Sequence, residues 1–532
     1  MKRRVLYIIL VVASAISFSC KDYITVEPQG FIPRDQTFKT ADDAITAVYG
    51  LYSLMQPCVD QLFLAGDVQA DLVVAARGAD SWVAEIAQNR ITPMNPYTDY
   101  SNFYKLVCAC NNTIKGLQEI QRLDPLNYSL DRYNYNIAEI TAIRAWGYLQ
   151  LVKIWGDVPY VENTVTNADE ITDIPVTEGN VILAKIEKEV CDKSYALFVS
   201  AMSPSGMSNL FYTQFNNRTV PFLIAELNLY LGNYPKVWNY VYKFVFTDHN
   251  YNCKGATINN WIQQFSYGGS GFSSCIALTI LFDGSKGQKN NLMRWTSNIN
   301  GGIYAVKPAS PIIKNWVSQP LWLSGSYDNN GTRLINGYGD PRGIGASYIV
   351  SNNDTIISKF LLKSKNTFKN PAQNDPETNN DMNFAIYRDG TLFLDICEAW
   401  NAMGMTYEAL MPLNGMSSSW KTFGGVRERA GVVNIDLFPS TTPDPYKSME
   451  KLVLNERALE SAFEGHRWFD LIRYAKRNND PSILADAVAS KYPAGQQAAI
   501  KIRLMSNRNY WYWPYYYKNV AANKLLVQKE GY

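Results

Sequence analysis

The chain has 532 residues, of which 47% are hydrophobic and only 18% are charged, and its formal net charge is +2. This composition predicts an ordered protein with a large core and excludes a disordered chain. Because nucleic acid needs a concentrated basic face, the near-neutral charge also argues against a nucleic-acid partner.

The N-terminus has the pattern of a secretory leader. "MKRR" is followed by an apolar run over residues 5–18 and by "SFSC", which ends at Cys20. The run has 14 residues, whereas a bilayer-spanning helix needs roughly 20. Ser19 before Cys20 favours a lipobox, in which Cys20 is acylated, although Ser17 stands where Leu is usual. The alternatives are a secreted protein with unmodified Cys20 and a membrane-retained leader.

The next 200 residues show helical periodicity. The stretch 40–55 predicts a capped helix, with Thr40 as N-cap and Asp42 and Asp43 near its positive end. The same spacing of apolar residues predicts helices over 104–120, 137–154, 181–198, 219–231 and 235–246. The joint "LGNYPKVW" predicts a tight turn between the last two.

From residue 251 to 350 the helical period is lost. This stretch holds 14 of the 33 glycines, with much Asn and Ser, and predicts a loop-rich region. Helical patterns return over 387–403, 406–410 and 455–474. We therefore expect a mostly α fold in two helical parts, whose helix pairs resemble tetratricopeptide units in period without their strict signature.

The cysteines do not form a disulfide framework. Without Cys20 the chain has seven, an odd and sparse set. Cys108 and Cys110 lack a second pair at zinc spacing, so we expect buried thiols and no metal or cofactor.

Three acids near the N-terminus, Asp60, Asp67 and Asp71, are spaced to share one helix face. We interpret them as a solvated face or helix caps. A calcium site, which prefers alternating oxygen ligands in a loop, is the alternative.

The stretch "NERALESAFEGHRWFDLIRY" (455–474) is dense in charge. Acids and arginines alternate at helical spacing, so that opposite charges can meet along one surface. A glycosidase could use two such carboxylates, but an arginine lowers the pKa of a neighbouring acid and a general acid needs a raised one. We predict a structural network, bent at Gly465 and neutralised by the arginines, of Glu456, Glu464, Arg467, Asp470 and Arg473.

The same stretch resembles the C-terminal signature of the SusD/RagB family of Bacteroidetes outer-membrane nutrient-binding lipoproteins. Further pieces match in the family's order across the mature chain: "VEPQGF", "GDVQADLV", "AEITAIRAWGYLQLVKIWGDVPYV", "YGDPRG", "GGVRERAG" and "LLVQKEGY". The segment "YWPYYYKNV" departs from the family's Trp-Pro-Ile-Pro-like pattern.

The resemblance implies a SusD-like scaffold of tetratricopeptide-like helix pairs, anchored by lipid to the outer membrane and facing outward. Its partner would be a SusC-like TonB-dependent transporter, and its ligand a glycan or, in some branches, a peptide. It implies no catalysis; a hydrolase or a purely structural scaffold is the alternative. We expect a signal peptide over 1–19, an N-terminal helical part over 20–250, a loop-rich ligand-binding region over 251–380 and a C-terminal helical part over 381–532.

A glycan binder needs flat aromatic faces together with amide and guanidinium groups. For any one aromatic the alternative is a place in the core, which we expect for Trp146, Trp155 and Trp316. The candidate binding residues are Trp295, Tyr304 and Trp322 with Arg294 and Asn298 in the loop-rich region, and Trp82 with Arg77 at a position that the resemblance suggests.

Overall fold

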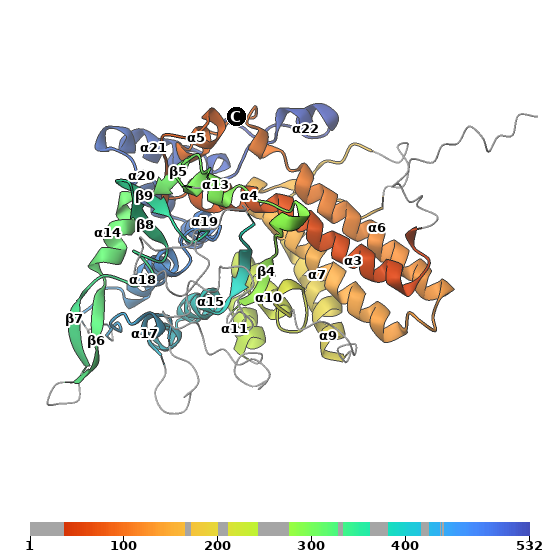
Figure 1. Cartoon of the computed structure of the whole chain (residues 1–532), viewed down its shortest axis with the longest axis horizontal. Coiled ribbons are helices and arrows are strands. Elements are labelled where there is room, and N and C mark those ends of the chain that lie inside the picture. Colours follow the sequence, from red (N-terminus) through yellow and green to blue (C-terminus); the bar gives the residue numbers. More distant parts are fainter. Residues whose placement is uncertain are drawn as a thin grey trace, which may run out of the picture.

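The computed structural model describes residues 37–164, 172–200, 211–242, 276–299, 301–327, 333–361, 381–415, 425–436, 438 and 441–532. The predicted leader and Cys20 lie outside these residues. The described chain is mostly helical with short strands (Figure 1), which confirms the predicted fold class. Among its described helices, none combines the length and apolar character needed to cross a bilayer.

Long helices form one side of the molecule (Figure 1). The first, α3 (Ala41–Met55), begins as predicted, because Thr40 and Asp43 form a reciprocal capping box. It packs against α6 (Ser101–Leu123), which packs against α7 (Leu130–Trp155). The remaining helices of this part are α8 (Gly179–Glu189), α9 (Ala196–Ser200), α10 (Val220–Leu231) and α11 (Tyr234–Tyr242). A π-helical turn, η6 (Val190–Tyr195), joins α8 to α9.

The turn between α10 and α11 confirms the predicted helical joint. Gly232 caps α10 with φ +71°, a left-handed conformation that favours glycine. The helix α7 is buried on most of its faces, in agreement with its nearly uniform apolar pattern.

The loop-rich prediction for the middle region missed a set of short antiparallel strand pairs. The strands are three to eight residues long there, too short for alternation to stand out beside glycine-rich turns. One further pair lies wholly in the N-terminal part, and two pairs join a strand of the middle region to a strand of a flanking part. The pairs are β1 (Val73–Ala75) with β5 (Val306–Pro308), β2 (Val158–Pro159) with β3 (Val176–Thr177), β4 (Ile276–Ile280) with β10 (Phe384–Arg388), β6 (Pro320–Tyr327) with β7 (Arg333–Tyr338), and β8 (Tyr348–Ser351) with β9 (Asp354–Ile357).

Short helices connect these strands and build the C-terminal part. One of them, α15, packs against α10, α11 and α18 and so joins the two helical parts. Their bounds are α4 (Val59–Phe63), α5 (Ser81–Ala87), α13 (Leu292–Thr296), α14 (Ser310–Ser318), α15 (Asp389–Ala402), α16 (Met411–Asn414), α17 (Val426–Ala430), α18 (Pro445–Glu460), α19 (Arg467–Arg477), α20 (Ser482–Ala489), α21 (Ala494–Ser506) and α22 (Tyr517–Ala522).

The core contains the tryptophans that the sequence assigned to it. Trp146, Trp155 and Trp316 are each at most 1% exposed. The five cysteines within the described residues are unpaired, and Cys58, Cys110 and Cys397 are fully buried. Cys253 and Cys275 lie outside the described part.

Candidate functional site

The charged stretch 455–474 folds as two helices separated by a break. Helix α18 ends at Glu460 and α19 begins at Arg467, and between them Gly465 has φ +81°. Its backbone touches a second glycine, because a Cβ on Gly66 would lie 2.2 Å from the Gly465 carbonyl carbon. The predicted bend at Gly465 is therefore confirmed. At this bend the backbones of Gly465 and Gly66 lie in a contact so close that only glycines allow it.

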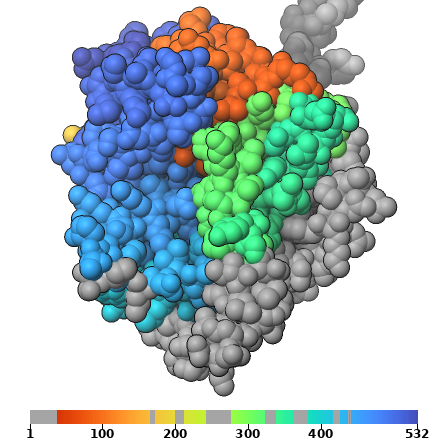
Figure 2. Space-filling view, turned by 90° about the vertical axis from the view of Figure 1, so that its left-hand side faces the viewer, coloured from red at the N-terminus to blue at the C-terminus, as the bar shows by residue number. Residues whose placement is uncertain are grey.

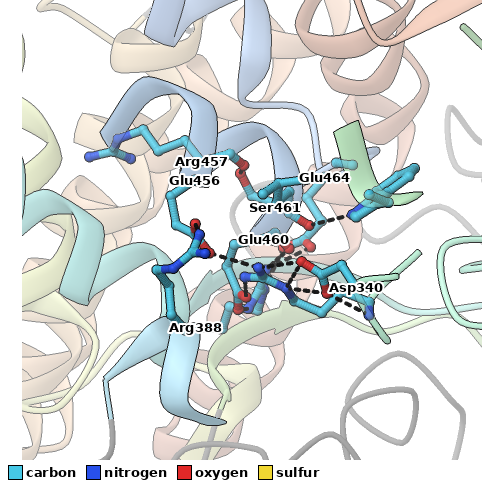
Figure 3. Close-up of polar contacts among 12 residues, drawn as sticks. Asp340, Arg388, Glu456, Arg457, Glu460, Ser461 and Glu464 are labelled. Carbon is cyan, nitrogen blue, oxygen red and sulfur yellow. Dashed lines mark hydrogen bonds and ion pairs between the residues drawn. The ribbon is translucent and has the colours of Figure 1, made fainter. Parts of the chain in front are cut away.

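The carboxylates of α18 point into the protein. Glu456 lies 2.7 Å and Glu460 2.8 Å from the guanidinium of Arg342, whose other partner is Asp340 at 2.6 Å. Figure 3 shows Glu456 and Glu460 gathered with Asp340 and Arg388. Arg342 has no exposed side-chain surface, so these groups form a buried and mutually neutralising cluster.

Glu464 has partners from outside its own helix. It lies 2.6 Å from both Lys359 and Arg388. Burial alone would raise the pKa of Glu464, but the charges of Arg388 and Lys359 hold that pKa below its usual range. A carboxylate held ionised in this way is poorly suited to act as a general acid.

The expectation that Glu464 pairs with Arg467 is wrong. The break at Gly465 places the two residues on separate elements, and Arg467 instead makes two hydrogen bonds of 2.7 and 2.8 Å to Asp71. The expected pair of Asp470 and Arg473 does form on α19, at 2.8 Å.

The interpretation of Asp60, Asp67 and Asp71 as a solvated face is also wrong. Asp67 is fully buried and accepts the backbone N–H groups of Phe463 and Gly465. Asp60 accepts the Asn291 side-chain amide at 2.6 Å. Within the described part of the chain, no three His, Cys, Asp or Glu side chains are grouped so as to hold a metal ion.

A second constellation lies at the surface where β1 meets β5. The N–H of Ala76 donates to the Ala305 carbonyl at 2.8 Å, and the N–H of Gly78 donates to the Tyr304 carbonyl at 2.9 Å. A Cβ on Gly78 would lie 1.6 Å from the Ile303 carbonyl oxygen. Glycine at this position therefore lets the turn that carries Arg77 approach a segment more than 200 residues away.

Two side chains of this constellation bond one carboxylate, and a third packs against one of them. Arg77 Nη1 lies 2.7 Å from Asp354 Oδ1, and Asn298 Nδ2 lies 2.8 Å from Asp354 Oδ2. Hydrogen bonds from Arg77 and Asn298 lower the pKa of Asp354. The Arg77 guanidinium also covers the ring of Tyr304, 4.7 Å from its centroid, and the Tyr304 hydroxyl donates to the Thr355 carbonyl. We call Arg77, Asn298, Tyr304 and Asp354 the Asp354 cluster.

The sequence named three members of this cluster and missed Asp354. That residue begins β9 directly after Asn352 and Asn353, both with positive φ. Consecutive asparagines at positive φ are typical of a tight hairpin turn, so "SNNDT" could have placed an acid at a hairpin tip. It could not have placed Arg77 beside it.

The other candidate residues lie in different environments. Trp82 is half-buried on α5, and Arg294 is exposed on α13. Trp295 is 3% exposed, with its ring 6.5 Å from Phe63 and 5.8 Å from Tyr97. The side chain of Trp322, in β6, lies outside the described part of the structure.

The cluster joins segments that are far apart in the chain. On the face shown in Figure 2, the orange N-terminal segment borders the green segment that spans 276–361, with the blue C-terminal helices beside both. The polar side chains of the Asp354 cluster reach solvent, since the Arg77 side chain is 63% exposed and that of Asp354 is 20% exposed.

Comparisons with known proteins agree over most of the chain. A model of the SusD family matches residues 276–532. SusD-like protein P38 of Formosa agariphila is 23% identical over 497 residues, which cover 88% of this chain and 90% of that relative. A SusD superfamily structure from Bacteroides thetaiotaomicron has a TM-score of 0.67 at 18% identity and covers 93% of this chain and 99% of its own. A laminarin-binding SusD-like protein has a TM-score of 0.62 at 17% identity, with 93% and 100% covered.

Proposed function

Because the chain belongs to the SusD family, we propose that it is a cell-surface lipoprotein that binds an extracellular oligosaccharide or polysaccharide. It then delivers this glycan to a TonB-dependent transporter in the outer membrane. The lipid anchor would be attached at Cys20. Glycan binding is supported by the fold that the chain shares with a laminarin-binding protein.

The observation that carries the proposal is the exposed Asp354 cluster. Sugar hydroxyls are both donors and acceptors, and here a guanidinium, an amide and a carboxylate lie within hydrogen-bonding distance of one another at the surface. Such convergent polar groups are what a glycan site needs to bind hydroxyls. Tyr304 is only 4% exposed and packs in a small core with Met293 and Ile349, so its ring supports Arg77 from below and offers no free face for stacking.

We propose that no catalysis accompanies binding. The acids of the stretch 455–474 that first suggested a hydrolase are held by buried cations, as for Glu464 with Lys359 and Arg388. Asp354 is ionised and bonded by Arg77 and Asn298, so it is suited to accept hydrogen bonds rather than to donate a proton.

The test is a binding screen of the lipid-free protein against glycans and peptides. For a bound glycan, Arg77→Ala is expected to raise Kd about tenfold or more, because a charge-assisted hydrogen bond is lost. Arg122→Ala is the matched control. Its side chain is 66% exposed and pairs with Glu119 on α6, so binding should not change.

Several outcomes would contradict the proposal. Equal glycan affinity in Arg77→Ala and the parent would exclude the Asp354 cluster, and a response to peptides alone would replace the ligand class. Release of reducing ends by the purified protein would show catalysis. Trp82→Ala tests the aromatic contribution, whereas Trp295→Ala would mainly disturb the core. Copurification with a barrel transporter tests delivery.

A further inference from the structure

We propose that the protein has a second binding site, for a small organic anion such as a sugar acid, in a cavity of about 250 Å³ between α7, α8, α10 and α19. The cavity is on the helical scaffold and shares no residue with the Asp354 cluster. Its volume is below the roughly 300–1,000 Å³ of sites for drug-sized ligands, which favours a ligand about the size of a single sugar ring.

The charge of the cavity wall selects the ligand class. Four cationic side chains line it, and none of the described lining residues is a carboxylate. The cations are Lys153, Arg473, Lys476 and Arg477.

The carboxylates that balance these cations lie behind the wall. Lys153 Nζ is 2.7 Å from Glu226, and both Arg473 and Arg477 are 2.7 Å from Glu398. The cavity therefore presents the positive side of a buried ion-pair network. Low-dielectric walls with one sign of charge concentrate counter-ions at the surface that they face.

The side chain of Tyr230 lines the cavity, and its hydroxyl lacks a partner among the described residues. The Tyr230 Oη is buried. Lys153 and Arg473 lie over the same ring, with Nζ 5.9 Å and Cζ 5.4 Å from its centroid. Since buried polar groups in native structures are nearly always bonded, this hydroxyl is a donor available to an oxyanion in the cavity.

The backbone around the cavity adds little charge of either sign. Asn180 in the lining lies in the first turn of α8, but Glu178 is the N-cap of this helix and the Gly179 N–H donates to the Asp157 carboxylate at 2.9 Å. The last carbonyls of α10 border the cavity too, but those of Leu229 and Asn228 accept the N–H groups of Gly232 and Asn233.

The remaining lining suits a ring-shaped body. Phe469, Tyr230 and Tyr512 contribute aromatic surface, and Leu183 and Ile472 contribute aliphatic surface. Aromatic faces pack well on the C–H face of a sugar. The combination of cations, a free hydroxyl and apolar walls fits a carboxylated or sulfated ring better than a bare inorganic ion.

Isothermal titration of the lipid-free protein with D-glucuronate, D-glucose and sodium sulfate tests this site. We expect D-glucuronate to bind at least tenfold more tightly than D-glucose, with an affinity that falls as salt rises. Lys476→Gln should weaken D-glucuronate binding about tenfold. Its side chain is exposed and lies 5.3 Å from the Tyr512 ring, so the variant should fold normally. The matched control, Lys501→Gln on α21, should bind like the parent.

Tyr230→Phe removes only the unpaired hydroxyl and keeps the ring that the cations cover. We expect weaker D-glucuronate binding at unchanged thermal stability. Equal affinities for D-glucuronate and D-glucose, no binding at millimolar concentration, or full affinity in Lys476→Gln would overturn the proposal. Binding of sulfate but not of D-glucuronate would contradict the proposal that the ligand is an organic anion. None of these results depends on the Arg77 variants, so this site and the proposed glycan site can fail separately.

Discussion

Arg467→Met should destabilise the protein strongly without affecting glycan binding. The substitution keeps most of the side-chain volume but removes both hydrogen bonds to Asp71, whose side chain is 11% exposed. It also removes the 2.7 Å hydrogen bond to the Leu454 carbonyl. Breaking a buried pair by removing one partner typically costs about 3–5 kcal/mol, because the other charge stays buried. Lys491 also lowers the pKa of Asp71, so we expect the lower end of this range.

The assay is urea unfolding of the lipid-free protein, with the free energy of unfolding taken from the midpoint and slope. Asp71→Asn combined with Arg467→Met should recover about 1–3 kcal/mol of the loss, because no unpaired charge remains. Lys501→Met is the control. Its pair with Asp486 is 42% and 60% exposed and should contribute less than about 1 kcal/mol.

Two results would refute this reasoning. If Arg467→Met costs no more than Lys501→Met, the buried pair does not stabilise the fold. If the glycan Kd of the folded variant rises while unfolding is unchanged, the stretch 455–474 is a binding site rather than a structural network.

Three further results are expected. Gly78→Ala should cost about 1–3 kcal/mol through overpacking against the Ile303 carbonyl and weaken glycan binding by moving Arg77. Gly50→Ala, where a Cβ meets nothing within 4 Å on α3, should instead stabilise the protein by about 0.5–1 kcal/mol. For either variant, a urea midpoint equal to that of the parent would contradict the prediction. Glu464→Gln should lose most stability above about pH 5. The folded pKa of Glu464 is lowered, so the unfolded chain takes up this proton first, and the difference from the parent should shrink as pH falls below that range; a pH-independent difference would count against it. Cys20→Ala should abolish fatty-acid labelling and membrane retention, and retained label would place the lipid elsewhere.

The helices could be predicted because their signals are local. Thr40 and Asp43 are three residues apart, and Gly232 ends α10 through its own backbone conformation. The helix ends differ from the predicted ones by a few residues, because fraying and capping depend on neighbours. The short strands were missed for two reasons. Pairs such as β1 with β5 join segments far apart in sequence, and local pairs such as β8 with β9 are too short for alternation to stand out.

The partners of the charged residues could not be predicted for the same reason. Glu464 was correctly expected to be neutralised, but its cations, Lys359 and Arg388, are 105 and 76 residues away. In the Asp354 cluster, Arg77 was named through the family resemblance and Asn298 as a polar neighbour of the aromatics in the loop-rich region. The 277 residues between Arg77 and Asp354 left no local signal of their contact. Spacing shows which side chains can share a helix face, and only the tertiary fold brings distant ones together.

The contact between Asp67 and the break at Gly465 has a consequence for how the chain folds. Asp67 and its N–H donor on Gly465 are 398 residues apart, and Asp71 and Arg467 are 396 apart. Contacts of such long range slow folding, since a long loop must close before they form. During synthesis the N-terminal acids stay without these partners until nearly the whole chain has emerged. The contacts of the C-terminal stretch are thus among the last to form, and a chain truncated before residue 463 should not reach the native state.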